Sequence, residues 1–584
     1  MVNKLFKQML LTQILSSMTV MLCMLVDSMM IGHFLGIDSM TAYGLSSPIL
    51  LIFAALGCMI SAGVQVVCGK TMGSGDKKGT NACYTASVVI IGLIALIGVA
   101  GVMLFTDQIC ILLGAGQPTP DNEVFRLTRD YLRGFIIGAP AFLVCQVMVP
   151  YMQISGKRIR LVAAVGLMTV GDILFDFLNV FWFKAGTFGM GLASSVSYFI
   201  AFFIGIVYFL RKSCIFKFSF KLLKLSVCGK LAAAGVPTLI NQISLVFLTF
   251  LLNKILLDVG GNIAVAAYSV ISTAGNICYS FSSGTAAVAL TLSSIFYSDE
   301  DRSSLRMTVK NMTMYAVSIC GIVTLVVLAA ATPMVMMFLE TPAAKDIAVE
   351  GLRIFVLSLV PCALNTCFKN YYQGIDRVKL SMLISVLQNF ALTAVSAFVL
   401  SRFAGVRGVW FGFMAGECLT FVIVSIYVFY KNKRFSVSAE AYSLISNDFG
   451  VKEENCLEFS ITEPEKVKTA SEKSFEFCRD RGISNKISSL IALCIEEMGN
   501  NITEHGFKNK NKKYIIDIRV MIMDDSPILR IRDNCENFDP VKYLELHQFD
   551  DDPTQHIGIR MVMKIVKSAN YVNAIGLNNL TLTM

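Results

Sequence analysis

Long apolar runs alternate with short polar segments over the first 430 residues or so of the chain. Each run approaches the ~20 residues that a helix needs to cross a bilayer. In lipid, a helix satisfies its own backbone hydrogen bonds. The pattern therefore predicts an all-α membrane domain of twelve transmembrane helices. They are expected near residues 9–31, 45–68, 86–106, 131–153, 161–183, 188–210, 232–256, 264–297, 311–333, 351–373, 380–401 and 408–430.

The composition supports this prediction. Hydrophobic residues make up 55% of the 584 positions and charged residues only 16%, whereas a soluble chain carries roughly 25% charged residues. The 17 cysteines are scattered through apolar runs, so we interpret them as buried, reduced thiols.

Basic residues gather in alternate loops between the predicted helices. Lys4 and Lys7 share one side with the loops that hold Lys77, Arg160 and Arg302. Cytoplasmic loops are enriched in lysine and arginine. Both termini are therefore expected in the cytoplasm, with the protein spanning the plasma or inner membrane many times.

An internal repeat relates the two halves of this region. LGIDSMTAY (35–43) aligns with GGNIAVAAY (260–268), and the same offset places Asp76 over Asp301. Each half contains six predicted spans, so the halves share one orientation. A parallel duplication is typical of alternating-access transporters. We expect lobes at 1–210 and 231–435, joined by a cytoplasmic loop at 211–230.

Three carboxylates lie within the six predicted spans of the first lobe. Asp27 is in the first, and Asp172 and Asp176 lie one helical turn apart in the fifth. A carboxylate in hydrocarbon is costly and usually faces a cavity where it has a role. Adjacent carboxylates can share a proton or hold a cation, since both do not easily stay charged together. We predict that these residues couple ion movement to transport.

Several segments resemble the multidrug and toxic compound extrusion (MATE) transporters over about residues 1–435. They are VDSMMIGHFLG (26–36), the GSGD loop, GAP (138–140), DILFDFLNVF (172–181), GMGLASS (189–195) and GVP (235–237). The resemblance implies an antiporter that exports small, drug-like or cationic compounds in exchange for H⁺ or Na⁺. Asp172 stands where the family usually has asparagine, which leaves the coupling ion open. Asn241 and Lys369 stand where one branch of the family has acidic residues.

The remaining residues predict a small α/β domain at 456–584, after a linker at 436–455. Strand-like segments are CLEFSIT, KYIIDIRVMIM, PILRIRD, YVNAIG and NLTLTM. Helix-like segments are PEKVKTASEKSFEFCRD, NKISSLIALCIEEMGNNITEHG and IGIRMVMKIVKSA. In the second of these helices, Glu497, Asn501 and His505 are spaced by four and so share one face.

Glu497-x-x-x-Asn501, followed by DNCENFDP (533–540) and HIGIRMV (556–562), resembles the GHKL ATP-binding domain of histidine kinases and anti-sigma-factor serine kinases. The resemblance implies that Glu497 is a general base, that Asn501 holds Mg²⁺ and that Asp533 accepts from adenine. His505 and Gly558 would complete the ATP site. Cys535 and His556 replace glycines of the family pattern, so the sequence leaves open whether ATP binds.

The sequence thus predicts an ion-coupled exporter with a regulatory cytoplasmic domain. Its expected partners are small-molecule substrates, membrane lipid and a cytoplasmic regulatory protein, but not nucleic acid. One alternative is a membrane-anchored anti-sigma-like serine kinase whose transporter half senses a ligand, so enzymatic activity stays an open question. Another is a flippase for lipid-linked precursors.

Overall fold

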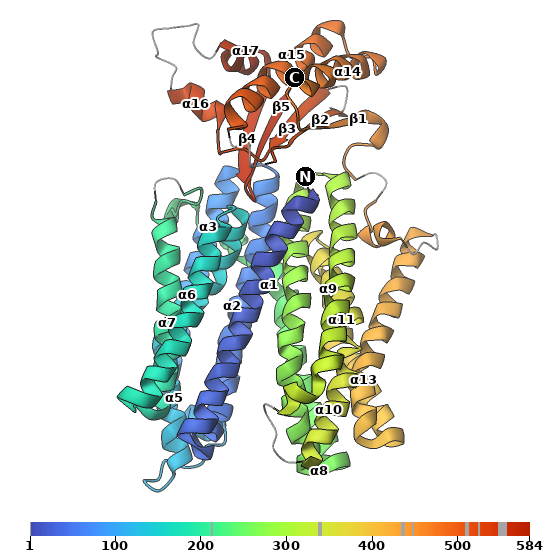
Figure 1. Ribbon diagram of the computed structural model, residues 1–584. Coiled ribbons are helices and arrows are strands. Elements are labelled where there is room, and N and C mark those ends of the chain that lie inside the picture. The colour runs from blue at the N-terminus through green and yellow to red at the C-terminus, as the bar shows by residue number, and fades with distance from the viewer. Residues whose placement is uncertain are drawn as a thin grey trace.

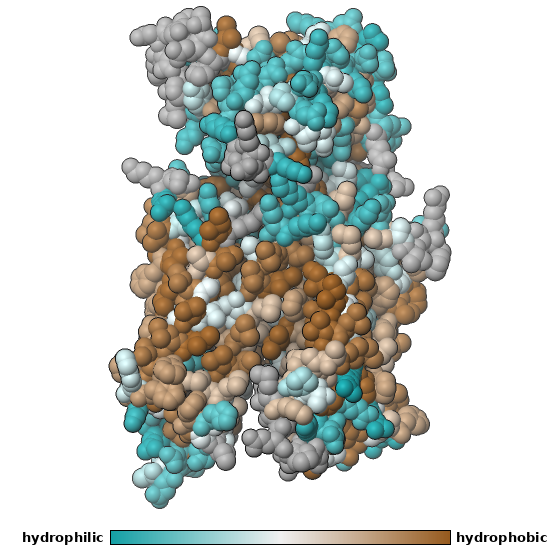
Figure 2. Space-filling view, viewed as in Figure 1, coloured by the Kyte–Doolittle hydropathy of each residue, from teal (hydrophilic) through white to brown (hydrophobic). Residues whose placement is uncertain are grey.

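The computed structural model describes residues 2–211, 214–336, 342–433, 438–446, 449–508, 513–523, 526–546 and 557–584. A long helical domain carries a small α/β domain at one end (Figure 1). We call this C-terminal domain, residues 449–584, the tail, and the helix ends that face it the tail side. On the face shown in Figure 2, the helical domain has a broad hydrophobic surface and the tail is largely hydrophilic.

The helical domain has most of the predicted membrane crossings as separate helices. Among the described residues, ten helices are long and apolar enough to cross a membrane. The pair at 345–356 and 359–374, which is bent by 48°, meets the same criterion when the two helices are taken together. The helix over 378–432 leaves helical geometry at Gly405 and so comprises two helices. These helices are compatible with the twelve predicted crossings.

The first lobe contains α1 to α7, and the second contains α8 to α13. The first-lobe bounds are α1 Val2–Met30, η1 Ile31–Leu35, α2 Ile37–Gly73, α3 Lys77–Leu104, α4 Thr106–Leu112, α5 Glu123–Ile154, α6 Arg158–Leu178, η2 Asn179–Phe183 and α7 Gly186–Phe209. After η3 Phe220–Leu222, the second lobe has α8 Leu225–Ser298, α9 Arg302–Met336, α10 Pro342–Val356, α11 Leu359–Gly374, α12 Val378–Val386, η4 Leu387–Ala391 and α13 Leu392–Asn432.

Glycines at matching positions mark the repeat. Gly36, between the first two spans, has φ 87°, and Gly261, its counterpart in the predicted alignment, has φ 64°. Gly186 and Gly405 occupy the turns before the last span of each lobe and also have positive φ. Left-handed backbone disfavours residues with a Cβ atom. Both copies therefore use glycine to turn the chain back into the membrane.

The tail is a five-stranded antiparallel sheet in the order β1-β2-β3-β5-β4, with helices on the face away from the membrane domain (Figure 1). Its elements are β1 Cys456–Ile461, α14 Lys466–Asp480, α15 Asn485–Gly506, β2 Ile516–Met523, β3 Ser526–Asp533, α16 Pro540–Leu546, α17 Ile557–Ile565, β4 Ser568–Ala574 and β5 Leu577–Thr583. Every strand and helix predicted for the tail is present. The last helix is shorter than predicted, because the chain enters β4 at Ser568.

The linker is ordered where the structure describes it. Its 3-10 helix η5, Ala439–Ser443, inserts Tyr442 into the second lobe. The Tyr442 ring stacks on Phe368 at 4.7 Å, and its hydroxyl lies 2.8 Å from Ser425 Oγ. Tyr372 Oη donates to the Tyr442 carbonyl at 2.9 Å. These contacts fix the base of the tail to the second lobe.

Candidate functional site

The predicted coupling carboxylates converge inside the first lobe. Asp27 lies on α1, and Asp172 and Asp176 lie on α6, and all three are buried. Asp27 is close enough to Asp172 and Asp176 to interact electrostatically with each. The structure therefore brings Asp27 of α1 close to the Asp172 and Asp176 pair of α6, from which it is far apart in the sequence.

These carboxyl groups are unequally satisfied. Ser197 Oγ donates to Asp172 Oδ1 at 3.0 Å. Among the described residues, Asp27 Oδ1 and both carboxylate oxygens of Asp176 have no hydrogen-bond partner. A buried charged acceptor without a donor is costly unless it is protonated or paired with a cation. Protonation of these carboxyl groups would remove that cost.

A second buried polar cluster lies in the second lobe. Asn365 Nδ2 donates to Glu417 Oε2 at 2.8 Å, and Gln388 Nε2 donates to Glu417 Oε1 at 3.2 Å. Nearby, Lys369 Nζ donates to Asn241 Oδ1 at 2.5 Å. In this lobe the Glu417 carboxylate already accepts hydrogen bonds, and Lys369 supplies a buried positive charge. A bound cation would therefore stabilise this cluster less than the carboxyl groups of the first lobe.

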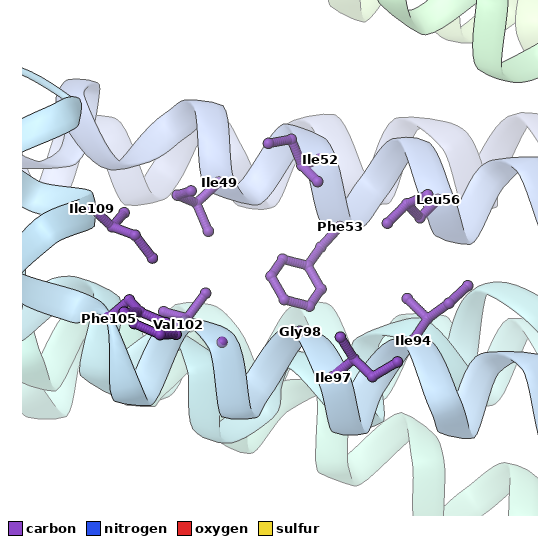
Figure 3. Close-up of a pocket in the computed structure, with 11 residues that line it drawn as sticks. Ile49, Ile52, Phe53, Leu56, Ile94, Ile97, Gly98, Val102, Phe105 and Ile109 are labelled. Carbon is purple, nitrogen blue, oxygen red and sulfur yellow. The ribbon is translucent and has the colours of Figure 1, made fainter.

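Figure 3 shows a pocket of about 390 Å³ between α2 and α3, lined entirely by apolar residues and glycines. Phe53 and Ile97 both point into it (Figure 3). The lining has no charged or hydrogen-bonding side chain. It suits hydrocarbon chains.

In the tail, Glu497 and Asn501 lie on α15 beside the start of α17. A Cβ atom on Gly558 would overlap Glu497 Oε2 and would lie 3.7 Å from Asn501 Nδ2. The absence of a side chain at Gly558 therefore lets the α17 backbone approach both residues. Helix N-termini bind phosphate groups, and an amide oxygen is a suitable Mg²⁺ ligand. These residues fit the phosphate side of a nucleotide site.

The other predicted residues of the nucleotide site are Asp533 and His505, together with Cys535 and His556 at glycine positions of the family pattern. Asp533 ends β3, and its Oδ1 accepts from Asn578 Nδ2 and from the Cys535 backbone N–H, each at 2.8 Å. Cys535 lies against Gly506, so the end of α15 accommodates its side chain. His505 is exposed one turn beyond Asn501. His556 is outside the described residues.

The sheet of the tail faces the membrane domain through three arginines that the sequence did not single out. Arg519 Nη2 lies 2.7 Å from Asp301 Oδ1. Arg530 Nη1 and Arg532 Nη2 each lie 2.6 Å from Asp299 Oδ2. We call these five residues the arginine–aspartate cluster. Asp299 and Asp301 belong to the turn between α8 and α9.

The cluster is almost completely buried, with the side chains of Asp301 and Arg530 only 1% and 4% exposed. Burial by itself would raise the pKa of Asp301. The guanidinium groups of Arg519, Arg530 and Arg532 outweigh burial and hold that pKa below its ordinary value. Asp301 is thus a permanently charged anchor at neutral pH.

Comparison with known proteins defines the class of the helical domain. The MatE family model matches residues 13–178 and 237–399, more than half of the chain. The chain belongs to the MatE family of transporters. The model of the histidine kinase-like ATPase domain matches residues 461–584, so the chain joins a MATE transporter to a domain of that type.

Relatives and solved structures agree with this assignment. The multidrug export protein MepA of Staphylococcus aureus (strain MRSA252) is 23% identical over 409 residues, which cover 68% of this chain and 87% of MepA. A multidrug resistance MATE transporter in an outward-facing conformation superposes with a TM-score of 0.68 at 18% identity, covering 72% of this chain and 94% of the other. The Vibrio cholerae transporter VcmN in its bent form has a TM-score of 0.67 at 17% identity, with 76% and 97% covered.

Proposed function

We propose that this protein is an antiporter that exports small, cationic or drug-like compounds across the plasma or inner membrane in exchange for H⁺ or Na⁺. The observation that carries the proposal is the group of buried carboxyls Asp27, Asp172 and Asp176, two of which have oxygens without a described donor. Binding of an ion there would neutralise the group. The name of MepA, a multidrug export protein, supports the substrate class.

In this proposal the tail side is cytoplasmic. Several basic loops lie on that side: Lys4 Nζ donates to the Lys513 carbonyl of the tail, and Lys77 lies 3.4 Å from Asp539. Basic loops favour the cytoplasm. The tail would then meet cellular ATP.

We further propose that the tail binds ATP with Mg²⁺ and regulates the transporter. Asn501 would hold Mg²⁺, and the N-terminus of α17 at Gly558 would hold phosphate. Asp533 would accept from the adenine. Bound Mg²⁺ would supply charge neutralisation for the phosphates. Glu497 is placed to act as a base toward a hydroxyl or water, so hydrolysis or transfer to a partner protein is the further activity to test.

The coupling proposal is tested by efflux of ethidium, a lipophilic cation, from proteoliposomes under an imposed H⁺ or Na⁺ gradient. Asp27→Asn and Asp176→Asn remove a titratable group without changing its size, and each is expected to lower gradient-driven efflux at least tenfold. Asp121→Asn, at an exposed loop position, is the matched control and should behave like the unmodified protein. Full efflux in both variants would exclude these carboxyls as the coupling site.

A further inference from the structure

The inner face of the tail sheet is a docking surface for the transporter. Along β3, Leu529 and Ile531 point into the hydrophobic core beneath the helices of the tail. Arg530 and Arg532, between and after them, point the other way, as alternation along a strand requires. On an isolated domain that face would be exposed to water, yet here both arginines are buried against Asp299 and Asp301.

The same sheet also reaches the first lobe. The Ile575 backbone N–H, in the turn between β4 and β5, donates to the Ile154 carbonyl at 2.5 Å. Gly576 packs on Gly156, so closely that a Cβ atom on Gly156 would overlap its backbone. Ile575 belongs to the hydrophobic cluster of the membrane domain rather than to the core of the tail. One rigid sheet therefore holds both lobes.

The lobes themselves meet on the tail side. Ser294 Oγ of α8 donates to the Gln65 carbonyl of α2 at 2.8 Å, and Thr291 Oγ1 donates to Gln65 Oε1 at 3.1 Å. Lys70 pairs with Asp376 across the same junction. In alternating access, one lobe rocks against the other. The lobes cannot separate here while the tail is bound to both.

We propose that the tail is a clamp across the lobes, which holds the tail side of the transporter closed and must leave the first lobe before that side opens. This inference rests on the proposed exporter function and specifies how the tail regulates it. The arginine–aspartate cluster is the fixed anchor on the second lobe. The β4–β5 turn is the releasable contact on the first.

The nucleotide site is placed to control this release. Asp533 follows Arg532 directly on β3, and its partner Asn578 lies on β5. Asn578 Oδ1 accepts from Tyr571 Oη on β4 at 2.7 Å. A ligand that moves Asp533 therefore acts on the strands that carry the anchor and the turn. Nucleotide binding is expected to alter the grip on the first lobe.

Hydrogen–deuterium exchange of the full-length protein in lipid nanodiscs tests the clamp, because the Ile575 amide is protected through a bond to the other domain. Asp299→Lys places a cation among the guanidinium groups and should undock the tail. We expect exchange at least threefold faster in residues 568–577 and at the tail-side ends of α2 and α8. Glu300→Lys makes the same charge change at the exposed neighbouring position. It should leave exchange unchanged in residues 568–577 and at the ends of α2 and α8. Unchanged exchange in α14 and α15, which pack in the separate core of the tail, would show that the Asp299→Lys variant is folded.

Each outcome has a definite meaning. Unchanged exchange at 568–577 in Asp299→Lys would overturn the clamp. Faster exchange at 568–577 without any change in α2 and α8 would also overturn the clamp, because the tail would then contact the lobes without holding them closed. A non-hydrolysable ATP analogue with Mg²⁺ should shift exchange at 568–577 in the unmodified protein, and no shift would overturn nucleotide control. If Asp27→Asn exports ethidium as fast as the unmodified protein, the exporter proposal is refuted. The exchange measurements do not depend on that result.

Discussion

Gly558 shows how one missing side chain shapes the tail site. The α17 backbone lies directly on the Glu497 carboxylate at this residue, and any Cβ atom would displace that carboxylate. A carboxylate and a helix N-terminus attract each other. Glu497 therefore lies beside the backbone that we propose to bind phosphate, and a phosphate group would have to share this space with the Glu497 carboxylate.

Gly558→Ala is predicted to destabilise the tail by about 1–3 kcal/mol, the usual cost of forcing a methyl group into a packed site. It should also weaken Mg²⁺-ATP binding by the full-length protein at least tenfold in calorimetric titration. Asn501→Ala should weaken binding to a similar degree with little loss of stability. Ile557→Ala is the control, since Ile557 is 63% exposed. If Gly558→Ala and Asn501→Ala both bind Mg²⁺-ATP with wild-type affinity, the phosphate site does not lie at this end of α17.

The buried carboxyl groups of the first lobe could be singled out from the sequence, and the arginine–aspartate cluster could not. Asp27 and Asp176 stand out because a carboxylate in an apolar span is costly and therefore informative. Arg530 and Arg532 alternate with apolar residues, which is also the pattern of a strand with one face in water. Only the docking of the sheet on Asp299 distinguishes the two cases, and that depends on tertiary structure.

Among the elements, the short helix η5 is important for the packing of the second lobe. Its Tyr442 fills space between spans of the second lobe, and Tyr371 Oη and Arg377 Nη2 donate to the Ser443 and Leu444 carbonyls at 3.1 and 2.7 Å. The segment is thus part of the packing of the lobe. Because this segment is tied down, the tail has little freedom to move away from the second lobe.

Tyr442→Ala is predicted to lower the free energy of unfolding of the second lobe by about 3–5 kcal/mol, because it leaves a cavity beside Phe368. Tyr442→Phe loses only the hydroxyl contact with Ser425, which is worth about 1 kcal/mol. Thermal unfolding of the detergent-purified protein, monitored by intrinsic fluorescence, should rank the variants in that order. Equal melting temperatures for all three proteins would show that η5 is peripheral.

The elements themselves follow closely from the periodicity of the sequence, and the exceptions have physical causes. The helix predicted from residue 557 ends at Ile565, because residues from Ser568 pair with β5 in a ladder that local propensity does not reveal. The short helix α16 begins at Pro540, where Asp539 Oδ1 accepts from the backbone N–H groups of Val541 and Lys542. Such a brief segment has too few residues for a periodic signal.

At the scale of the whole molecule, two hydrophobic cores divide the chain, one in the membrane and one between the sheet and helices of the tail. The β4–β5 turn crosses this division, since Val572, Ala574 and Ile575 pack with the membrane core. Most of each core is nevertheless built from the elements of its own domain. We therefore predict that the transporter folds without the tail.

A chain that ends at Ser446, which keeps η5 and lacks the tail, is predicted to fold and to export ethidium under an ion gradient. Its efflux should be insensitive to Mg²⁺-ATP, whereas efflux by the full-length protein should change severalfold. A chain that ends at Lys433 also loses Tyr442 and should melt at a lower temperature. Failure of the longer truncation to insert or fold would show that the two domains are one cooperative unit.

The duplicated turns between the second and third spans of each lobe differ in their part in the junction with the tail. Asp76 Oδ1 accepts from the Gly79 N–H at the start of α3, and Asp301 Oδ1 accepts from the Ser304 N–H at the start of α9. Both aspartates thus cap a helix, as their ancestor would have done before duplication. Among the described residues, only the second copy also binds arginines of the tail. Its capping aspartate acts together with Asp299, which stands where the first copy has Ser74. The junction with the tail thus uses one carboxylate that both turns share and one that only the second turn has.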